Sequence, residues 1–461
     1  MVEIFNKFDQ HLNMNALDQD NRDKIAYNIS HYNAVFERAK KQYAELELAK
    51  ERAAAIKYKV LNELDKYLIE FETNFVKRGG KVIWARNEEE AIREILAIVE
   101  RKSAKYIVKS KSTITEEIHL NEHLSNAGLI IQETSLGEFI HQENKDKSYH
   151  FVLPDISKTN EDIVAFFNKK FGLSLNISSP EISLYVRKLL RDKLTKADIG
   201  ITGANFLIAD VGGVALTENE GNALMSVSFS KTHIVIAGID KVIPALKDLD
   251  LFWPLLATHG TGQKITAYNS IVLGPKQDGE IDGTENMYVI LLDNGRTNLL
   301  GKVEQRRALS CIHCGACLNA CPVYKAVGGE AYKTTYSGPI GAVISPYLNG
   351  PEEYGYLSFM SSLCGNCSAV CPVKINLHEL LILNRNDAVV NHQTSLKERI
   401  LMFGWKTLMG NRKYLDMPSF KHKNWFLKTF FSKVWGPSKA LPVIKDKSFK
   451  QLWEERNNPR P

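Results

Sequence analysis

The spacing of the cysteines constrains this chain more than any other feature of its sequence. All seven lie within residues 311–371, and the first four form the run C-x2-C-x2-C-x3-C-P from Cys311 to Pro322. This spacing is typical of proteins that bind two cubane iron–sulfur clusters. Three thiolates, each separated from the next by two intervening residues, converge on one cluster. The fourth begins a segment that leads away, so it reaches a second cluster.

A second motif, C-x2-C-x3-C-P, runs from Cys364 to Pro372, and Ser361 stands where its first cysteine would be. By the crossed rule, four cysteines bind the first cluster: Cys311, Cys314, Cys317 and Cys371. Three bind the second: Cys321, Cys364 and Cys367. We favour two [4Fe–4S] clusters. The alternative for the second is a [3Fe–4S] cluster, and a four-iron cluster there would take water, serine or substrate on its fourth iron.

A zinc ribbon is the competing interpretation of clustered cysteines. Zinc needs four tetrahedral ligands, which accounts for neither the C-x2-C-x2-C triplet nor the two Cys-Pro ends. The sequence therefore favours iron–sulfur clusters that relay electrons between a donor and an acceptor protein. His313, inside the first cysteine run, is more typical of a solvent-facing loop residue than of one that tunes a cluster potential.

Hydropathy and charge indicate the cellular compartment of the protein and the part of the chain that carries its positive charge. The N-terminus lacks the basic start and apolar run of a signal peptide, and no stretch has the apolar length of a membrane span. We therefore expect a cytoplasmic protein, where thiols stay reduced. The net charge of +6 arises in the tail, where residues from Asn391 onward contain 15 Lys and Arg against 5 Asp and Glu.

Four regions are expected along the 461 residues: 1–78 helical, 79–300 α/β, 301–393 ferredoxin-type, and 394–461 basic and aromatic. The periodic apolar pattern predicts helix from Asp18 to Lys77, ended by Gly79 and Gly80. Strands are predicted at 81–85, 106–109, 129–131, 149–153, 199–202, 233–237 and 288–292. Helices are predicted at 88–101, 115–127, 160–171 and 181–194, with Asn87 as a cap. This alternation predicts a sheet covered by helices on both faces.

The α/β region also resembles a known family. Val108–Ile118, Leu120–Asn121, Leu136–Ile140, Thr202–Asp210 and Glu218–Asn222 resemble the lactate-utilisation (LUD) domain. With the cysteine motifs, Tyr336–Val343 and Pro372–Leu380, nearly the whole chain is similar to the lactate-utilisation protein B family. The resemblance implies a three-layer α/β sandwich like that of sugar-phosphate isomerases and CoA transferases. It also implies two cooperating partners, oxidation of L-lactate to pyruvate, and the seven cysteines as cluster ligands.

The α/β region has residues for a small-molecule site. Lys109 and Lys111 leave a strand end, where α/β sheets place ligands, and both are candidates to hold a carboxylate. Asp210, Glu218 and Glu220 are candidates to move protons. The competing interpretation is a solvated strand end beside tight turns. No G-x-G-x-x-G run with a distant acidic residue is present, so a Rossmann NAD site is not supported.

Three functions follow from these features. The first is an electron-transfer component of a multiprotein lactate-oxidising system. The second is a self-contained LUD-domain enzyme that acts on a small acid or phosphorylated substrate, and the third is a cluster-bearing scaffold. We favour the first because two adjacent clusters need a donor and an acceptor.

The tail interleaves Trp and Phe with Lys. This pattern fits docking on a partner or on the chain itself, with peripheral membrane contact as an alternative. No nucleic-acid-binding fold accompanies it, so nucleic acid is not an expected partner.

Overall fold

The computed structural model describes residues 16–144, 158–391, 393, 396–411, 414, 419–432 and 440–457. The chain divides after Ala388 into two units, and each is described by itself. The strand predicted at 149–153 lies outside the described residues.

The N-terminal region is helical, as predicted, in three segments: α2 (Gln19–Ala39), α3 (Leu46–Asn62) and α4 (Leu64–Lys77). The Asp18 side chain caps α2 by accepting the Asn21 N–H at 3.0 Å. Helix α4 ends at Lys77, and Gly79 follows with φ of +83°, a conformation that favours glycine.

The core is a six-stranded sheet in the order β1-β10-β7-β4-β2-β3, with all neighbours parallel. Its strands are β1 (Lys81–Ala85), β2 (Tyr106–Lys109), β3 (Ile130–Glu133), β4 (Ile199–Thr202), β7 (Thr232–Gly238) and β10 (Asn286–Leu292). The six described strands expected from the sequence all lie in this sheet. Strand β7 is buried along its whole length, because Ile234 and Ile236 face one layer while Val235 and Ala237 face the other.

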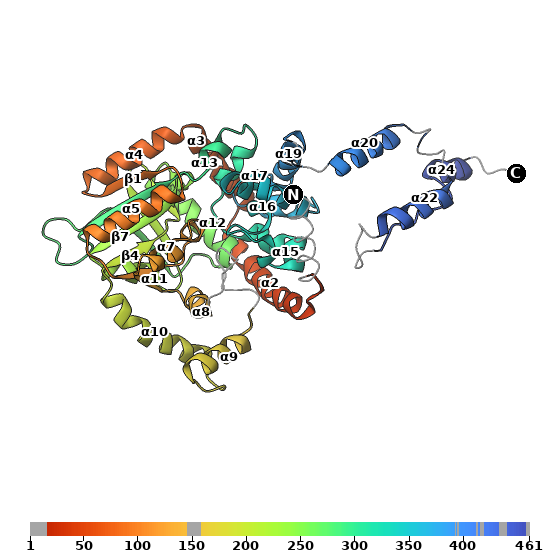
Figure 1. Cartoon of the computed structure of the whole chain (residues 1–461). Coiled ribbons are helices and arrows are strands. Elements are labelled where there is room, and N and C mark those ends of the chain that lie inside the picture. Colours follow the sequence, from red (N-terminus) through yellow and green to blue (C-terminus); the bar gives the residue numbers. More distant parts are fainter. Residues whose placement is uncertain are drawn as a thin grey trace. The chain divides into compact units, whose positions relative to one another are not determined.

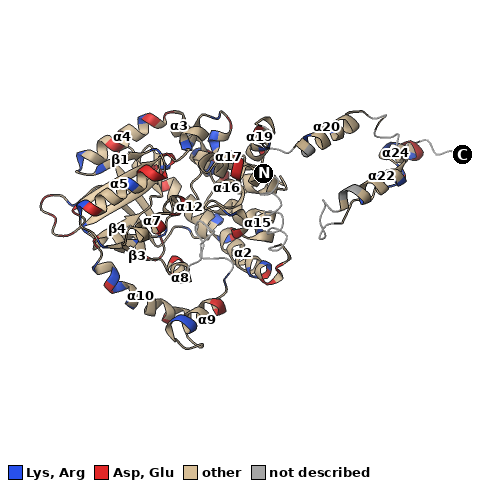
Figure 2. Cartoon of the chain, viewed as in Figure 1, with Lys and Arg blue, Asp and Glu red and all other residues tan. Residues whose placement is uncertain are grey.

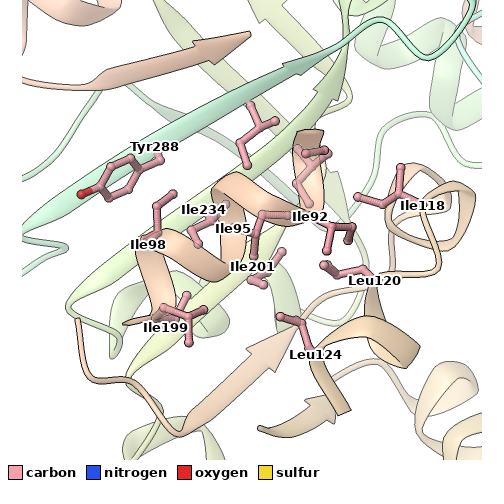
Figure 3. Close-up of a cluster of buried hydrophobic side chains, with 14 of the residues drawn as sticks. Ile92, Ile95, Ile98, Ile118, Leu120, Leu124, Ile199, Ile201, Ile234 and Tyr288 are labelled. Atoms are coloured by element: carbon pink, nitrogen blue, oxygen red, sulfur yellow. The ribbon is translucent and has the colours of Figure 1, made fainter. Parts of the chain in front are cut away.

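Helices cover one face of the sheet, as predicted: α5 (Glu88–Arg101), α6 (Thr113–Glu117) and α7 (Leu120–Asn126). Asn87 caps α5 by accepting the Glu90 N–H at 3.0 Å. Figure 3 shows Ile92, Ile95 and Ile98 of α5 directed at the isoleucines of the strands. Each such buried side chain contributes about 1.5–3 kcal/mol to stability. The single helix predicted at 115–127 is divided, because His119 has φ of +46° between α6 and α7.

The opposite face differs from the expected layer of helices. A second sheet, in the order β8-β5-β6-β9, packs there together with α4. Its strands are β5 (Phe206–Ile208), β6 (Gly213–Glu218), β8 (Val242–Ile243) and β9 (Tyr268–Val272). Three more helices pack directly on β2 through Val108, Phe139 and Phe167. They are α8 (Leu136–Asn144), α9 (Asn160–Phe171) and α10 (Ser179–Thr195). Figure 1 shows α9 and α10 as a separate arm beside the sheet.

Short helices follow the last strand of the main sheet and form the cysteine region. They are α13 (Arg296–Leu300), α14 (Ala316–Ala320), α15 (Pro322–Val327), α16 (Gly338–Leu348), α17 (Pro351–Tyr354), α18 (Asn366–Val370) and α19 (Leu377–Val390). Two 3-10 helices, η4 (Gln305–Ser310) and η6 (Gly355–Met360), precede the two cysteine motifs. Two further helices, α11 (Asn222–Ser228) and α12 (Leu249–Thr261), belong to the α/β region.

The second unit contains the helices α20 (Leu396–Gly410), α22 (Phe420–Phe426) and α24 (Phe449–Asn457), with a π-helix at Leu427–Phe431. Large apolar side chains are exposed on α20, including Phe403 at 73% and Trp405 at 53%. Helix α22 carries the basic residues Lys421 and Lys423 (Figure 2). Among the described helices of the whole chain, none combines the length and apolar character needed to cross a membrane.

Candidate functional site

All seven cysteines lie in the described part of the chain and carry free thiols. Cys364 is exposed, Cys311 is half-buried, and the others are buried. Burial raises the pKa of Cys311 to about 12 and that of Cys367 to about 11. Such thiols stay protonated until a metal takes the sulfur and releases the proton.

Four of the cysteines surround one small pocket: Cys311, Cys314, Cys317 and Cys371. Its remaining walls are apolar and include Ile312, Ile340 and Val373. Backbone N–H groups point at two of the sulfurs, since His313 donates to Cys311 Sγ at 3.3 Å and Ile375 donates to Cys371 Sγ at 3.4 Å. Low polarity and N–H···S hydrogen bonds are the means by which proteins set a cluster's reduction potential.

The other three cysteines, Cys321, Cys364 and Cys367, are electrostatic neighbours. Burial and then Cys364 raise the pKa of Cys321, while burial and then Cys321 raise that of Cys367. Throughout the described residues, no three His, Cys, Asp or Glu side chains converge on a single metal ion. The sulfurs that bind the corners of a cubane lie farther from one another than the sulfurs that bind one zinc ion, because each of the latter is about 2.3 Å from the same metal.

A second, polar pocket of about 260 Å³ lies at the carboxyl edge of the main sheet. Ser110–Ile114 after β2, Gly203–Asn205 after β4 and Lys241 after β7 line it. Parallel strands bring their carboxyl ends to the same edge, which is where such sheets bind ligands. The remaining wall includes Ile312 and His313 of the first cysteine loop, so the pocket joins the α/β region to that loop.

Three of the residues proposed from the sequence line this pocket. Lys111 pairs with Glu138 at 3.0 Å. Glu218 accepts the N–H groups of Ala223 at 2.6 Å and Leu224 at 2.9 Å, so its carboxylate caps α11. Glu220 accepts the Leu136 N–H at 3.0 Å, and burial raises its pKa.

Lys109 and Asp210 do not line the pocket. Lys109 is fully buried, with its Nζ 2.7 Å from Glu133 and 2.9 Å from Glu116. Burial disfavours its ammonium, but the two carboxylates outweigh this and raise its pKa. Asp210 is exposed and accepts the Leu246 N–H at 3.0 Å. Both side chains therefore have structural partners outside the pocket.

Sequence reasoning missed Lys241, whose Nζ has no hydrogen bond or ion pair among the described residues. The side chain is half-buried because the pocket opens onto it, and burial lowers its pKa. The signal in the sequence was weak, because Lys241 follows a buried strand by only three residues. His313, expected to face solvent, is half-buried, stacks edge-on against Tyr336 at 5.4 Å and lines the pocket.

A buried ionic cluster joins the α/β region to the segment between the cysteine motifs. The Arg296 guanidinium donates twice to Glu117, at 2.9 and 2.8 Å, and once to Asp240 at 2.7 Å. The Tyr336 hydroxyl donates to the same Glu117 carboxylate at 2.6 Å. Burial alone would raise the pKa of Asp240, but Arg296 lowers it. These contacts hold the region around Tyr336 against the carboxyl edge of the sheet.

Two protein-family models match the chain. Residues 68–292 match the LUD domain, and residues 307–375 match the 4Fe-4S dicluster domain. The seven cysteines within the second match fit two iron–sulfur clusters.

Curated relatives match across most of the chain. Lactate utilization protein B of Geobacillus sp. (strain WCH70) is 43% identical over 349 residues, 75% of this chain and 73% of the relative. That of Shouchella clausii is 41% identical over 368 residues, 80% and 77% of the two chains. That of Bacillus subtilis is 43% identical over 349 residues, 75% and 73%. By its fold, its two domains and these relatives, the chain belongs to the lactate utilization protein B family.

Proposed function

We propose that this protein is the iron–sulfur electron-transfer component of a multiprotein system that oxidises L-lactate to pyruvate in the cytoplasm. One observation carries the proposal: the polar pocket and the pocket of four cysteines share a wall. Ile312 and His313 line the first, while Cys311 and Cys314 on either side of them line the second. A small molecule in the polar pocket would therefore lie one loop away from the first group of sulfurs.

The cysteines divide into two ligand sets under this proposal. The first set is Cys311, Cys314, Cys317 and Cys371, which surround a single pocket. The second set is Cys321, Cys364 and Cys367. Both sets are assigned to [4Fe–4S] clusters, which when bound supply one-electron transfer. A [3Fe–4S] cluster on the second set is the alternative.

Burial gives the two sets different roles. The first is enclosed by apolar side chains that exclude water, whereas the second includes the exposed Cys364. The second set is therefore the side on which an electron-carrying partner would dock. The exposed aromatic and basic tail offers another subunit a further contact surface, with peripheral membrane contact as the alternative.

The need for partners follows from the chemistry of lactate oxidation. The reaction removes two electrons and two protons, and a cubane accepts electrons singly. The polar pocket, at about 260 Å³, is smaller than the about 300–1,000 Å³ usual for drug-sized ligands. It suits a small acid better than a flavin or a nicotinamide dinucleotide.

The same pocket favours a second candidate function, a LUD-domain enzyme that acts on a small acid itself. Lys241 presents a half-buried ammonium there, and its Nζ has no carboxylate within ion-pair distance among the described residues. An ammonium in a partly dehydrated pocket attracts a carboxylate more strongly than one in water.

One experiment separates the two functions. The anaerobically purified chain is mixed with L-lactate, alone or with an extract of an organism lacking this protein, and cluster reduction is followed by EPR. The electron-transfer role predicts a reduced-cluster signal only when the extract is present. Equal reduction by lactate alone would instead identify a self-contained enzyme. D-lactate is the matched control for non-specific reduction.

A further inference from the structure

The two cysteine loops repeat one backbone conformation. Each follows a six-residue 3-10 helix, η4 before Cys311 and η6 before Ser361. The residue after the helix is extended in both loops, with φ and ψ of −59° and 129° at Cys311 and −86° and 138° at Ser361. Ser361 therefore occupies the place in the second loop that Cys311 occupies in the first.

Left-handed residues occur at matching positions in both loops. His313 has φ of +55° and Leu363 has +57°, each two residues after the position compared. Gly315 and Gly365 follow with +79° and +81°. Non-glycine residues rarely adopt this region, because it strains the backbone. Its recurrence at Leu363 indicates that the second loop keeps the whole cluster-binding conformation, although one cysteine is missing.

A hydrogen bond confirms the match at the level of atoms. The His313 N–H donates to Cys311 Sγ at 3.3 Å, and the Leu363 N–H donates to Ser361 Oγ at 3.1 Å. The serine oxygen thus takes the position of the cysteine sulfur, with the same backbone donor behind it. Arg385 of α19 holds this segment by donating to the carbonyls of Ser358 at 2.9 Å and Ser361 at 2.8 Å.

The exchange of ligands between loops completes the argument. Cys371, at the end of the second loop, lines the pocket of Cys311, Cys314 and Cys317. By the same exchange, Cys321 at the end of the first loop joins Cys364 and Cys367. In the second set of ligands, Ser361 therefore stands at the position that Cys311 holds in the first set.

We propose that Ser361 is the fourth protein ligand of the second cluster, bound through Oγ. The inference rests on the ligand sets of the proposed function and extends them by one residue. On binding, an iron–oxygen bond forms, the hydroxyl proton passes to solvent, and the solvent molecule that would otherwise hold that iron is excluded. No electron is transferred in this step. An oxygen donor is harder than a thiolate, so Ser361 lowers the potential of this cluster relative to an all-cysteine one.

The test compares the wild-type protein with Ser361→Ala, Ser361→Cys and the control Ser362→Ala, all purified anaerobically. Ser362 is the exposed neighbour on the same segment. The measurements are iron and acid-labile sulfide per chain, Mössbauer spectra, and EPR after mild oxidation. The first cluster is an internal control for folding in every variant.

We expect about eight iron atoms per chain in wild type, Ser361→Cys and Ser362→Ala, and about seven in oxidised Ser361→Ala, with a three-iron EPR signal. Ser361→Cys is also expected to raise the potential of the second cluster. In wild-type protein labelled with ¹³C-serine, ENDOR should detect hyperfine coupling between the second cluster and a ¹³C nucleus of serine. This coupling should be lost in Ser361→Ala.

Two results would overturn the assignment: no ¹³C coupling in wild type, or Ser361→Ala with unchanged iron content, oxidation resistance and spectra. Each leaves the proposed function intact, because both clusters are still present. A wild-type chain without acid-labile sulfide would instead remove the proposed function itself. If Ser361→Ala does not fold, the ¹³C measurement on wild type and the potential of Ser361→Cys decide alone.

Discussion

Replacing Arg296 with methionine tests how the α/β region is joined to the cysteine region. The guanidinium is only 4% exposed and supplies two of the four hydrogen bonds that Glu117 accepts. It also supplies the contact to the Asp240 carboxylate. Methionine keeps much of the side-chain length but none of the donors, so two buried carboxylates lose their counter-charge.

Removing one partner of a buried ion pair costs about 3–5 kcal/mol, because the remaining charge stays uncompensated. For a domain of the size of the matched LUD region, this corresponds to a fall in Tm of about 6–20 °C. Far-UV circular dichroism during urea and thermal unfolding measures the effect. Loss of cluster absorbance should occur at a correspondingly lower temperature, because the ionic cluster also holds Tyr336.

The matched control is Arg86→Met. Arg86 also pairs with a glutamate, Glu90, but its side chain is 86% exposed, so we expect no measurable loss of stability. If Arg296→Met and Arg86→Met unfold at the same urea concentration, the buried ionic cluster around Arg296 does not join the two regions.

Three further predictions concern single side chains that are buried or half-buried. Burial lowers the pKa of His233 to about 3 and that of His259 to about 4, below the unfolded value near 6.5. Their stability contribution is full above pH 6.5 and is lost as pH falls towards the folded values, by about 2 kcal/mol per histidine at pH 5. Urea unfolding of His233→Gln should show a shallower pH dependence, and an unchanged slope would refute this. We expect saturating pyruvate to stabilise the wild-type protein by about 2.7 kcal/mol at one hundred times its Kd, which raises Tm, and we expect Lys241→Met to abolish this rise. An equal rise in both proteins would exclude Lys241 from the pocket's binding function. Lys109→Met should lower the free energy of unfolding by about 3–5 kcal/mol, since it leaves Glu133 buried without its partner. Wild-type stability in this variant, measured by urea titration, would contradict the structural role of Lys109.

Local patterns predicted the elements of the main sheet well. Asn87 was predicted to cap a helix over 88–101, which are the bounds of α5 as observed, and β1, β2 and β4 also match the predicted residues. These features depend on neighbours a few residues apart, so they can be read along the chain. In the second sheet, which was missed, β5 and β8 are only three and two residues long. Strands that short have no periodicity of their own and form only by pairing.

The candidate site divides in the same way. Lys109 and Lys111 look equivalent in sequence, yet the first is the last residue of β2 and is buried in ion pairs, whereas the second follows the strand and reaches the pocket. Lys241 and His313 meet Lys111 around the pocket although they are distant from it in sequence. No local pattern records such an encounter, because it depends on the order of strands in the sheet.

The sequence by itself determined the chemistry of this protein. Cysteine spacing is a local geometric property, so it specified two iron–sulfur clusters before any fold was considered. Tertiary structure decided which lysine reaches the pocket, that a cluster loop forms its wall, and that Ser361 adopts the conformation of Cys311. Those outcomes depend on side-chain direction and on contacts between segments far apart in the chain, which packing alone sets.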